Sequence, residues 1–341
     1  MAYDRKPARV PSDIDSLVSI VQEYREIHEA RDLAVQLADR WMPQQLLPLF
    51  ELVPVRRDSW AEFLACLTQE LLLRGACLRN NLAVNDCLRS LQQLEHPLAF
   101  LPMKLTRAER QTATNYRESV NPSHWRDSRN WQSTGSLHWT DGLNRESIGS
   151  SYWTDGPLPN NYYIPDPQTE SCGRGSAKFV TCRDTATREQ RQAIGAFVEH
   201  WNGSPKVLLL QAAEPLALEE LVPVGANRYL PDGSWREIEK GMHISFSDVY
   251  EMLLHVTYRR GSYTQGMKGA YGRAAVWQSI AGLIRAPLDT PVVRVNELAA
   301  RWHWLSFDQS FGTYWVYQHF AIGALSPRGH YLSLLLCYDT D

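Results

Sequence analysis

The C-terminal part of the chain contains the run His319-Phe-Ala-Ile-Gly-Ala-Leu-Ser-Pro-Arg-Gly-His-Tyr-Leu-Ser-Leu-Leu-Leu-Cys-Tyr338. Two apolar stretches stand on either side of Ser326-Pro-Arg-Gly329, whose proline and glycine are typical turn residues. This pattern predicts a β-hairpin. Single strands are predicted over Ala177–Cys182 and over Lys206–Ala212, which is rich in valine and leucine, and a second hairpin over Asn227–Ile238.

Helical patterns lie between these strands in irregular order. Thr187 and Gln190 have the spacing of a capping box, and they open a helix that we expect to reach Trp201. Ser247 is the expected N-cap of a second helix, and a third covers Ala274–Ile284. Because neighbouring strands are predicted to pair locally, the pattern favours an α+β fold with mixed helices and antiparallel hairpins over a doubly wound sheet.

Residues 1–118 are predicted to form an irregular helical layer. Apolar residues recur there at intervals of three and four, as in the run Leu33–Trp41, which stops before Pro43. A second run covers Trp60–Leu72, and Gly75 lies near its end. Four or five short helices joined by short loops are therefore expected in this region.

Residues 119–176 form an aromatic-rich, irregular segment in which aliphatic residues almost vanish. Ser133–Gly142 and Ser147–Gly156 are near-repeats, because seven of ten positions match at a spacing of 14. Each copy ends in Trp-Thr-Asp-Gly, which we interpret as an extended stretch closed by a turn. The alternative is a chance duplication in a compositionally biased loop. Residues 177–341 form the α+β region, and all three regions are compatible with packing as one body.

Charge and cysteine usage limit the function classes. The formal net charge of -3 at pH 7 excludes a generally basic nucleic-acid binder, although it leaves room for a local basic patch. We find no secretory signal, and the longest apolar runs are a few residues, whereas a membrane span needs about 20. The six cysteines form no C-x-x-C pair, so we expect buried free thiols and a cytoplasmic location.

The densest collection of chemical groups is the segment Arg259-Arg-Gly-Ser-Tyr-Thr-Gln-Gly-Met-Lys-Gly-Ala-Tyr-Gly-Arg273. Its four glycines allow close approach of the backbone to a ligand, and a helix is expected to start directly after it. Backbone amides at a helix start, together with arginine and lysine, suit phosphate or carboxylate. The expected anion-binding residues are Arg259, Arg260, Lys268, Tyr271 and Arg273. The spacing matches no nucleotide-binding motif, and the alternative is a glycine-rich loop with solvated charges.

The aromatic-rich segment is the second candidate site. Four of the twelve tryptophans fall within it: Trp125, Trp131, Trp139 and Trp153. Exposed aromatic rings beside Asp and Asn suit stacking on a sugar or a base, and an Asp–His pair can transfer protons. On this hypothesis the catalytic candidates are His138, Asp141 and Asp155. The alternative is that the tryptophans anchor a long loop and the aspartates form turns.

Other chemistry is sparse in the sequence. It contains neither H-E-x-x-H nor G-x-S-x-G, and its ten histidines lack metal-ligand spacing. We therefore expect no metal site and no cofactor.

Three C-terminal motifs carry a resemblance to a known family. Gly269-Ala-Tyr-Gly-Arg-Ala-Ala-Val-Trp277, Arg301–Phe307 and Tyr338-Asp-Thr-Asp341 resemble a bacterial family catalogued as a domain of unknown function. The resemblance covers roughly the last 80–100 residues. It implies no activity, cofactor or catalytic residue.

Two functions of different classes are compatible with these observations. The first is a binding or interaction protein without chemistry of its own, because catalytic motifs are missing and aromatic residues suit interfaces. Its partner would be a protein or a small anionic ligand, and the sequence does not specify an oligomeric state. The alternative is an enzyme that acts on a small substrate bearing phosphate or carboxylate, or containing a sugar, whose anion the cations would clamp.

Overall fold

The structure is a computed structural model that describes residues 16, 18–19, 27–55, 59–110, 171–172, 182–201, 205–217, 241–258, 267, 269–307 and 316–340. Contacts between residues divide the chain into two compact units. The first unit contains residues 1–105, 120–127 and 269–271, and the second contains residues 106–119, 128–268 and 272–341. The expected hairpin over 227–238 and the near-repeats of the aromatic-rich segment lie outside the described residues.

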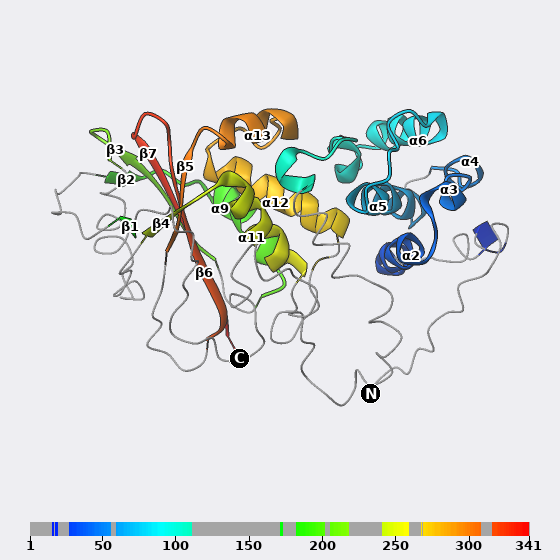
Figure 1. Ribbon diagram of the computed structural model, residues 1–341, viewed down its shortest axis with the longest axis horizontal. Coiled ribbons are helices and arrows are strands. Elements are labelled where there is room, and N and C mark those ends of the chain that lie inside the picture. The colour runs from blue at the N-terminus through cyan, green and yellow to red at the C-terminus, as the bar shows by residue number, and fades with distance from the viewer. Residues whose placement is uncertain are drawn as a thin grey trace. The chain divides into compact units, whose positions relative to one another are not determined.

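The first unit is helical in its described part (Figure 1). Its elements are α2 (Ile27–Arg40), α3 (Pro43–Leu46), α4 (Leu49–Leu52), α5 (Ser59–Leu73), α6 (Leu82–Gln93) and the 3-10 helix η1 (Pro97–Phe100). The most buried of them is α5, in which nearly every side chain is removed from water. A helix that is buried on all sides belongs at the centre of a helical layer, and its buried polar side chains need partners there. The other helices supply amphipathic faces to it, as α2 does with Leu33 and Leu37.

Local signals explain where these helices begin and end. The side chain of Asn81 accepts a hydrogen bond from Val84 N at 3.0 Å and caps the start of α6. Gly75, with φ of 81°, ends α5 in the left-handed conformation that glycine adopts without strain, as its position in the sequence predicts. Glu95 ends α6 in the same conformation, with φ of 57°.

The described part of the second unit contains a seven-stranded sheet in which all neighbouring strands are antiparallel. The strands are β1 (Ser171–Cys172), β2 (Cys182–Asp184), β3 (Lys206–Ala212), β4 (Gly241–Ile244), β5 (His303–Phe307), β6 (Val316–Leu325) and β7 (Tyr331–Thr340). They are arranged in the order β1-β4-β5-β6-β7-β3-β2. The expected C-terminal hairpin is confirmed as β6 and β7, and the expected strand Lys206–Ala212 as β3.

The turn between β6 and β7 requires glycine at position 329. Gly329 N donates to Ser326 O at 2.8 Å, and Leu325 pairs with Leu332 at the first position of the ladder. Gly329 has φ of 74°, and a Cβ atom there would lie 2.7 Å from Leu216 O. Glycine is therefore required at this position for its backbone conformation and for its small size.

Figure 1 shows that the described helices of the second unit gather on one face of the sheet. They are α9 (Arg188–Gly195), the 3-10 helix η5 (Ala196–Val198), α11 (Phe246–Tyr258), α12 (Gly269–Leu283), whose first three residues belong to the first unit, and α13 (Val292–Ala299). Ser333 of β7 donates to Leu283 O, and Trp304 of β5 donates to Ala299 O at 2.9 Å. Helices and an antiparallel sheet in one chain confirm the α+β fold class.

The starts of α9, α11 and α12 agree with the sequence pattern to different degrees. The capping box of Thr187 and Gln190 is confirmed, because each side chain accepts from the other residue's N–H. The prediction that Ser247 caps the second helix is wrong. The N-cap of α11 is Ser245, two residues before Ser247, because its hydroxyl accepts from Asp248 N. Helix α12 starts at Gly269, so the last five residues of the expected glycine-rich loop are already helical.

Candidate functional site

The segment expected to bind anions is described in part. Arg259, Arg260 and Lys268 lie outside the described residues. Tyr271 and Arg273 stand in the first turns of α12, and each is engaged by a carboxylate of the protein itself. Tyr271 donates to Glu62, whereas Arg273 is fully buried and donates to Glu109. The candidates of the aromatic-rich segment, His138, Asp141 and Asp155, lie outside the described residues as well.

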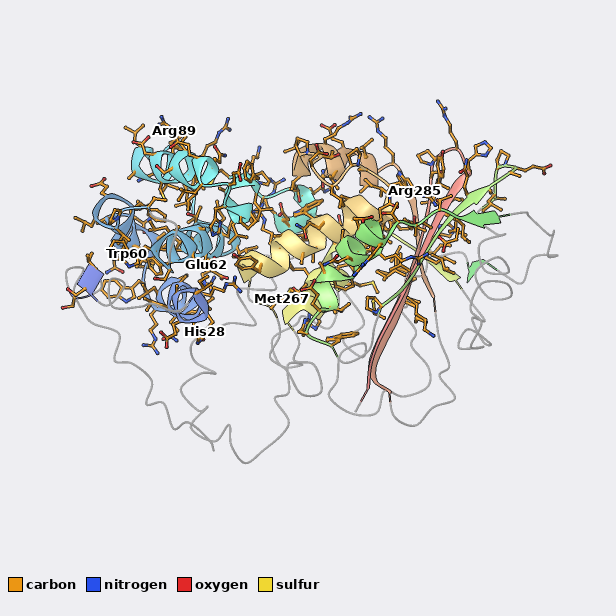
Figure 2. All side chains as sticks on the ribbon, turned by 180° about the vertical axis from the view of Figure 1, so that it is seen from behind. His28, Trp60, Glu62, Arg89, Met267 and Arg285 are labelled. Atoms are coloured by element: carbon orange, nitrogen blue, oxygen red, sulfur yellow. The ribbon has the colours of Figure 1, made fainter. Side chains whose placement is uncertain are left out.

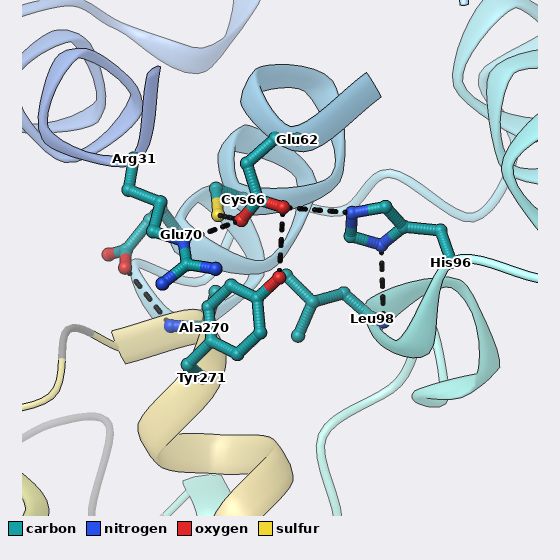
Figure 3. Close-up of polar contacts among 8 residues, drawn as sticks. All are labelled: Arg31, Glu62, Cys66, Glu70, His96, Leu98, Ala270 and Tyr271. Carbon is teal, nitrogen blue, oxygen red and sulfur yellow. Dashed lines mark hydrogen bonds and ion pairs between the residues drawn. The ribbon is translucent and has the colours of Figure 1, made fainter. Parts of the chain in front are cut away.

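Glu62, on helix α5, is the centre of a dense polar cluster in the first unit (Figure 3). Its Oε1 atom accepts from Arg31 Nε at 2.8 Å and from the thiol of Cys66 at 3.4 Å. Its Oε2 atom accepts from the hydroxyl of Tyr271 at 2.9 Å and faces His96 Nε2 at 3.2 Å. Both carboxylate oxygens are therefore occupied by donors from the protein. We call Arg31, Glu62, Cys66, His96 and Tyr271 the Glu62 cluster.

The local structure explains why these side chains meet. Glu62 and Cys66 are four residues apart on α5 and so lie on the same face of the helix. Arg31 comes from α2 and also lies with its guanidinium 4.0 Å from the centre of the Tyr271 ring, a cation–π contact. The Nδ1 atom of His96 faces Leu98 N at 3.4 Å and accepts from it, which leaves Nε2 as the donor toward Glu62.

The contacts within the cluster move the pKa values of its ionisable groups away from neutral pH. Burial alone would raise the pKa of Glu62, but hydrogen bonds from His96, Arg31 and Tyr271 lower it to about 2. Burial first, and then the charge of Glu62, raise the pKa of Tyr271. The same two causes raise the pKa of the Cys66 thiol. At neutral pH the carboxylate is thus charged, and the phenol and the thiol are protonated.

A second carboxylate of α5, that of Glu70, accepts a hydrogen bond from the first turn of helix α12. Glu70 Oε1 accepts from Ala270 N at 3.2 Å, so a negative charge sits at the positive end of the helix dipole. The same glutamate pairs with Arg74, whose Nε also donates to Asp39 at 3.0 Å. A Cβ atom on Gly269 would lie 2.7 Å from Glu70 Oε1, so a side chain larger than hydrogen would displace this carboxylate.

The second unit has a buried carboxylate of its own. Glu109 and Arg273 are both fully buried and form an ion pair. Glu109 Oε1 also accepts from Trp277 Nε1 at 2.9 Å and from the hydroxyl of Tyr250 at 3.4 Å, while Thr106 N donates to Oε2. Burial by itself would raise the pKa of Glu109, but the charge and hydrogen bond of Arg273 lower it. The charge of Arg273 and the surrounding donors compensate for the removal of this carboxylate from water, which a buried charge requires.

The contacts of Glu62 and Glu109 suit the packing of helices against one another better than the transfer of a proton. A general acid or base works best with a pKa near the working pH, and a cysteine nucleophile needs a lowered pKa. Neither condition is met by Glu62, Tyr271 or Cys66. No group of three or more His, Cys, Asp or Glu side chains with the geometry of a metal site occurs in the described part of the chain.

Sequence reasoning did not single out Glu62 or Glu109. Glu62 carries a weak signal, because it interrupts the apolar residues of α5, whose neighbours Phe63 and Leu64 are fully buried. A charged residue in an otherwise buried helix requires a partner. Thr106 and Glu109 also have capping-box spacing, and the reciprocal bonds are present. Their distant partners, Tyr271 and Arg273, could not be read from local pattern.

Comparison with known proteins gives one match. No curated protein and no solved structure matches the sequence. Among the described helices, none has the length and apolar character needed to cross a membrane. The model of a family of unknown function (DUF6183) matches residues 7–341, far more than the last 80–100 residues in which the resemblance was seen. The chain therefore belongs to the DUF6183 family.

Proposed function

We propose that this protein works by binding a protein partner or a small anionic ligand, and that it carries out no chemistry at the Glu62 cluster. The observation that supports the proposal is the direction of the pKa shifts in that cluster. Glu62 has a pKa of about 2, and the pKa values of Tyr271 and Cys66 are raised. None of these groups changes its protonation state readily near neutral pH, so none is suited to act as a general acid or base there.

The geometry of the cluster supports the same proposal. Its donors come from α2, α5, the residues before η1 and the start of α12, so a single carboxylate joins four segments of the first unit. Glu62 itself is only 6% exposed, which leaves little room for a substrate at the carboxylate. Buried polar groups whose hydrogen bonds are all satisfied make a fold rigid and specific.

A cytoplasmic location is part of the proposal. Among the described cysteines, Cys66, Cys77, Cys87 and Cys337 are free thiols. Burial raises the pKa of Cys87 to about 12 and that of Cys337 well above its ordinary value. Buried thiols that are inert in this way suit a reducing compartment.

Untargeted mass spectrometry tests the proposal. The purified chain is incubated with a deproteinised cell extract, and compounds are quantified over time and after ultrafiltration. We expect retention of one or more anionic compounds, with no time-dependent consumption, equally in the wild type and in Glu62→Gln. Glu51→Gln, a change at an exposed glutamate of α4, is the matched control. A compound converted by the wild type and by Glu51→Gln, but not by folded Glu62→Gln, would refute the proposal in favour of an enzyme.

A further inference from the structure

Arg285, labelled in Figure 2, is the second residue after the end of helix α12 and has an unusual backbone conformation. Its φ is 57°, in the left-handed region. Arg285 N donates to Gly282 O and Ala286 N to Ala281 O, the pattern of a helix end in which glycine is the usual residue. Left-handed backbone is unfavourable for a residue with a side chain. Glu95 has the same backbone conformation at the end of α6 and is exposed, so the case for a site at Arg285 depends on the contacts of its side chain.

The guanidinium group of Arg285 is only partly paired. Its Nη1 atom donates to Thr185 Oγ1 at 2.6 Å, and its Cζ atom lies 4.8 Å from the centre of the Tyr331 ring. Nε and Nη2 are buried and have no hydrogen-bond partner among the residues that the structure describes. These two nitrogens share one edge of the planar group. Their N–H bonds form the fork that holds two oxygens of a carboxylate or phosphate.

The neighbouring carboxylate does not fill this fork. Asp184 acts on Arg285 through its charge, but its Oδ1 atom accepts from Ala186 N at 3.0 Å and from Leu209 N at 3.3 Å. Its Oδ2 atom pairs with Arg191. Burial lowers the pKa of Arg285, as expected for a cation that is desolvated without full compensation. A buried donor without an acceptor is unfavourable, so an external oxyanion would be stabilised here.

Tyr331 connects Arg285 with a depression in the surface. The ring of Tyr331 covers the guanidinium group and is 39% exposed. It also lines an open depression of about 540 Å³, together with Gln211, Trp302, Arg328 and His330. Arginine and aromatic side chains around an open hollow suit a small anionic molecule. Arg285 itself does not line the hollow, so an anion in it would reach the fork only after the Tyr331 ring moves aside.

One electrostatic effect opposes an anion at this place. The C-terminal end of α12 carries the negative end of the helix dipole, which weakly disfavours an anion. A hydrogen bond to a charged group is stronger than this dipole effect, and a fork makes two of them. The final carbonyls of α12 are also occupied, since Leu283 O accepts from Ser333 and Gly282 O from Arg285 N. The fork therefore outweighs the dipole.

We propose that Arg285 is the centre of a binding site for a small molecule that carries a carboxylate or phosphate group. Thr185 fixes one side of the guanidinium, the fork of Nε and Nη2 binds the two oxygens, and Tyr331 covers them. The inference rests on the proposed function in that it takes binding as the activity, and it names the chemical class of the ligand.

The N–H signals of arginine Nε test the site directly. Full-length ¹⁵N-labelled protein is titrated separately with succinate and with inorganic phosphate at constant ionic strength. The Arg285 signal is assigned by its absence from Arg285→Lys, which keeps the charge but has no fork. We expect this signal to shift saturably with at least one probe, and the affinity to fall about tenfold or more in Arg285→Lys. The probe with the lower saturating concentration identifies the anionic group.

Two glycine variants separate the fork from the backbone. Arg285→Gly removes the side chain and suits the left-handed backbone, so we expect a folded protein that no longer binds the probe. Glu95→Gly makes the same backbone change at the end of α6, where the side chain is exposed, and should bind as the wild type does. The site is refuted if neither probe moves the Arg285 signal, or if Arg285→Gly binds normally. Consumption of a compound in the extract assay tests the proposed function independently.

Discussion

Glu62 and Glu109 illustrate how single buried carboxylates are stabilised in this protein. Each accepts from an arginine and from at least one aromatic side chain, and the pKa of each is lowered despite burial. A buried charge is tolerated only when its attraction to partners and its hydrogen bonds offset desolvation. Removal of the carboxylate charge leaves donors without acceptors, so both residues should be sensitive to substitution.

The first prediction concerns Glu62→Gln. The amide keeps the size of the side chain but offers one acceptor oxygen where the carboxylate offered two charged ones. We expect the free energy of unfolding at pH 7, measured with urea, to fall by about 2 kcal/mol. Glu51→Gln, on the exposed side of α4, should change it by less than about 0.5 kcal/mol. An equal effect of the two substitutions would contradict the role of Glu62 as the centre of its cluster.

The second prediction concerns the pair of Glu109 and Arg273. Glu109→Gln leaves a guanidinium that is fully buried without its counter-charge, and we expect a loss of about 3–5 kcal/mol. Because Glu109→Gln/Arg273→Met removes both charges, it should lose less than the sum of the single variants. A double-mutant cycle from chemical denaturation measures this difference, expected at about 1–3 kcal/mol. Strict additivity would show that the two side chains are not coupled.

At the scale of single elements, helix α11 offers a test of its cap. Asp248 N donates to Ser245 Oγ at 3.2 Å, and Ser245 N donates to Asp248 Oδ2 at 2.9 Å. Ser245→Ala should therefore lower the free energy of unfolding by about 1 kcal/mol. Ser247→Ala, two residues later within the helix, should have an effect below about 0.5 kcal/mol. The reverse order in thermal or urea unfolding would restore Ser247 as the cap.

The hairpin of β6 and β7 depends on the glycine of its turn. Gly329→Ala places a Cβ atom in the left-handed conformation and 2.7 Å from Leu216 O. We expect a loss of about 2 kcal/mol or more in the free energy of unfolding. Pro327→Ala affects the same turn without either conflict and should cost no more than about 1 kcal/mol. If Gly329→Ala is as mild as Pro327→Ala, the segment around Leu216 does not pack on the turn as described.

The elements themselves were largely predictable because their signals are local. The strand Lys206–Ala212, the hairpin and the capping box of Thr187 follow from apolar runs, turn residues and short spacings. The cap at Ser247 was wrong because two serines flank Phe246 and pattern does not choose between them. The start of α12 was placed too late because glycines suggested a loop, whereas the carboxylate of Glu70 accepts from Ala270 N and stabilises the helix start.

The candidate site was much less predictable. The sequence drew attention to Tyr271 and Arg273 through their neighbours, but not to the carboxylates that they meet in the structure. Those carboxylates are 209 and 164 residues away in sequence. Arg285 belongs to no sequence motif. Its fork lacks a partner because the neighbouring carboxylate of Asp184 binds Ala186 N and Arg191 instead, and these contacts are visible only in the folded structure. Such long-range pairing depends on tertiary packing, which periodicity does not encode.

At the scale of the whole molecule, the lowered pKa values make stability depend on pH. A carboxyl group whose pKa is lower in the folded state stabilises the protein above its unfolded pKa of about 4.3, and this contribution disappears as pH falls through the folded pKa. For Glu62 that pH window runs from about 4.3 down to about 2. We expect the free energy of unfolding to decline by about 2 kcal/mol or more across it, and less steeply in Glu62→Gln. Equal slopes for the two proteins would contradict this linkage.

Glu62 stays ionised at physiological pH because hydrogen bonds from His96, Arg31 and Tyr271 stabilise its carboxylate. Carbon-detected NMR of the side-chain carboxyl group, assigned with Glu62→Gln, measures this directly. The pKa of about 2 predicts a constant chemical shift of the Glu62 carboxyl carbon from pH 8 down to pH 4. A titration of this signal with a midpoint between about 5 and 7 would instead identify a poised acid or base, and would contradict the assignment of a purely binding function.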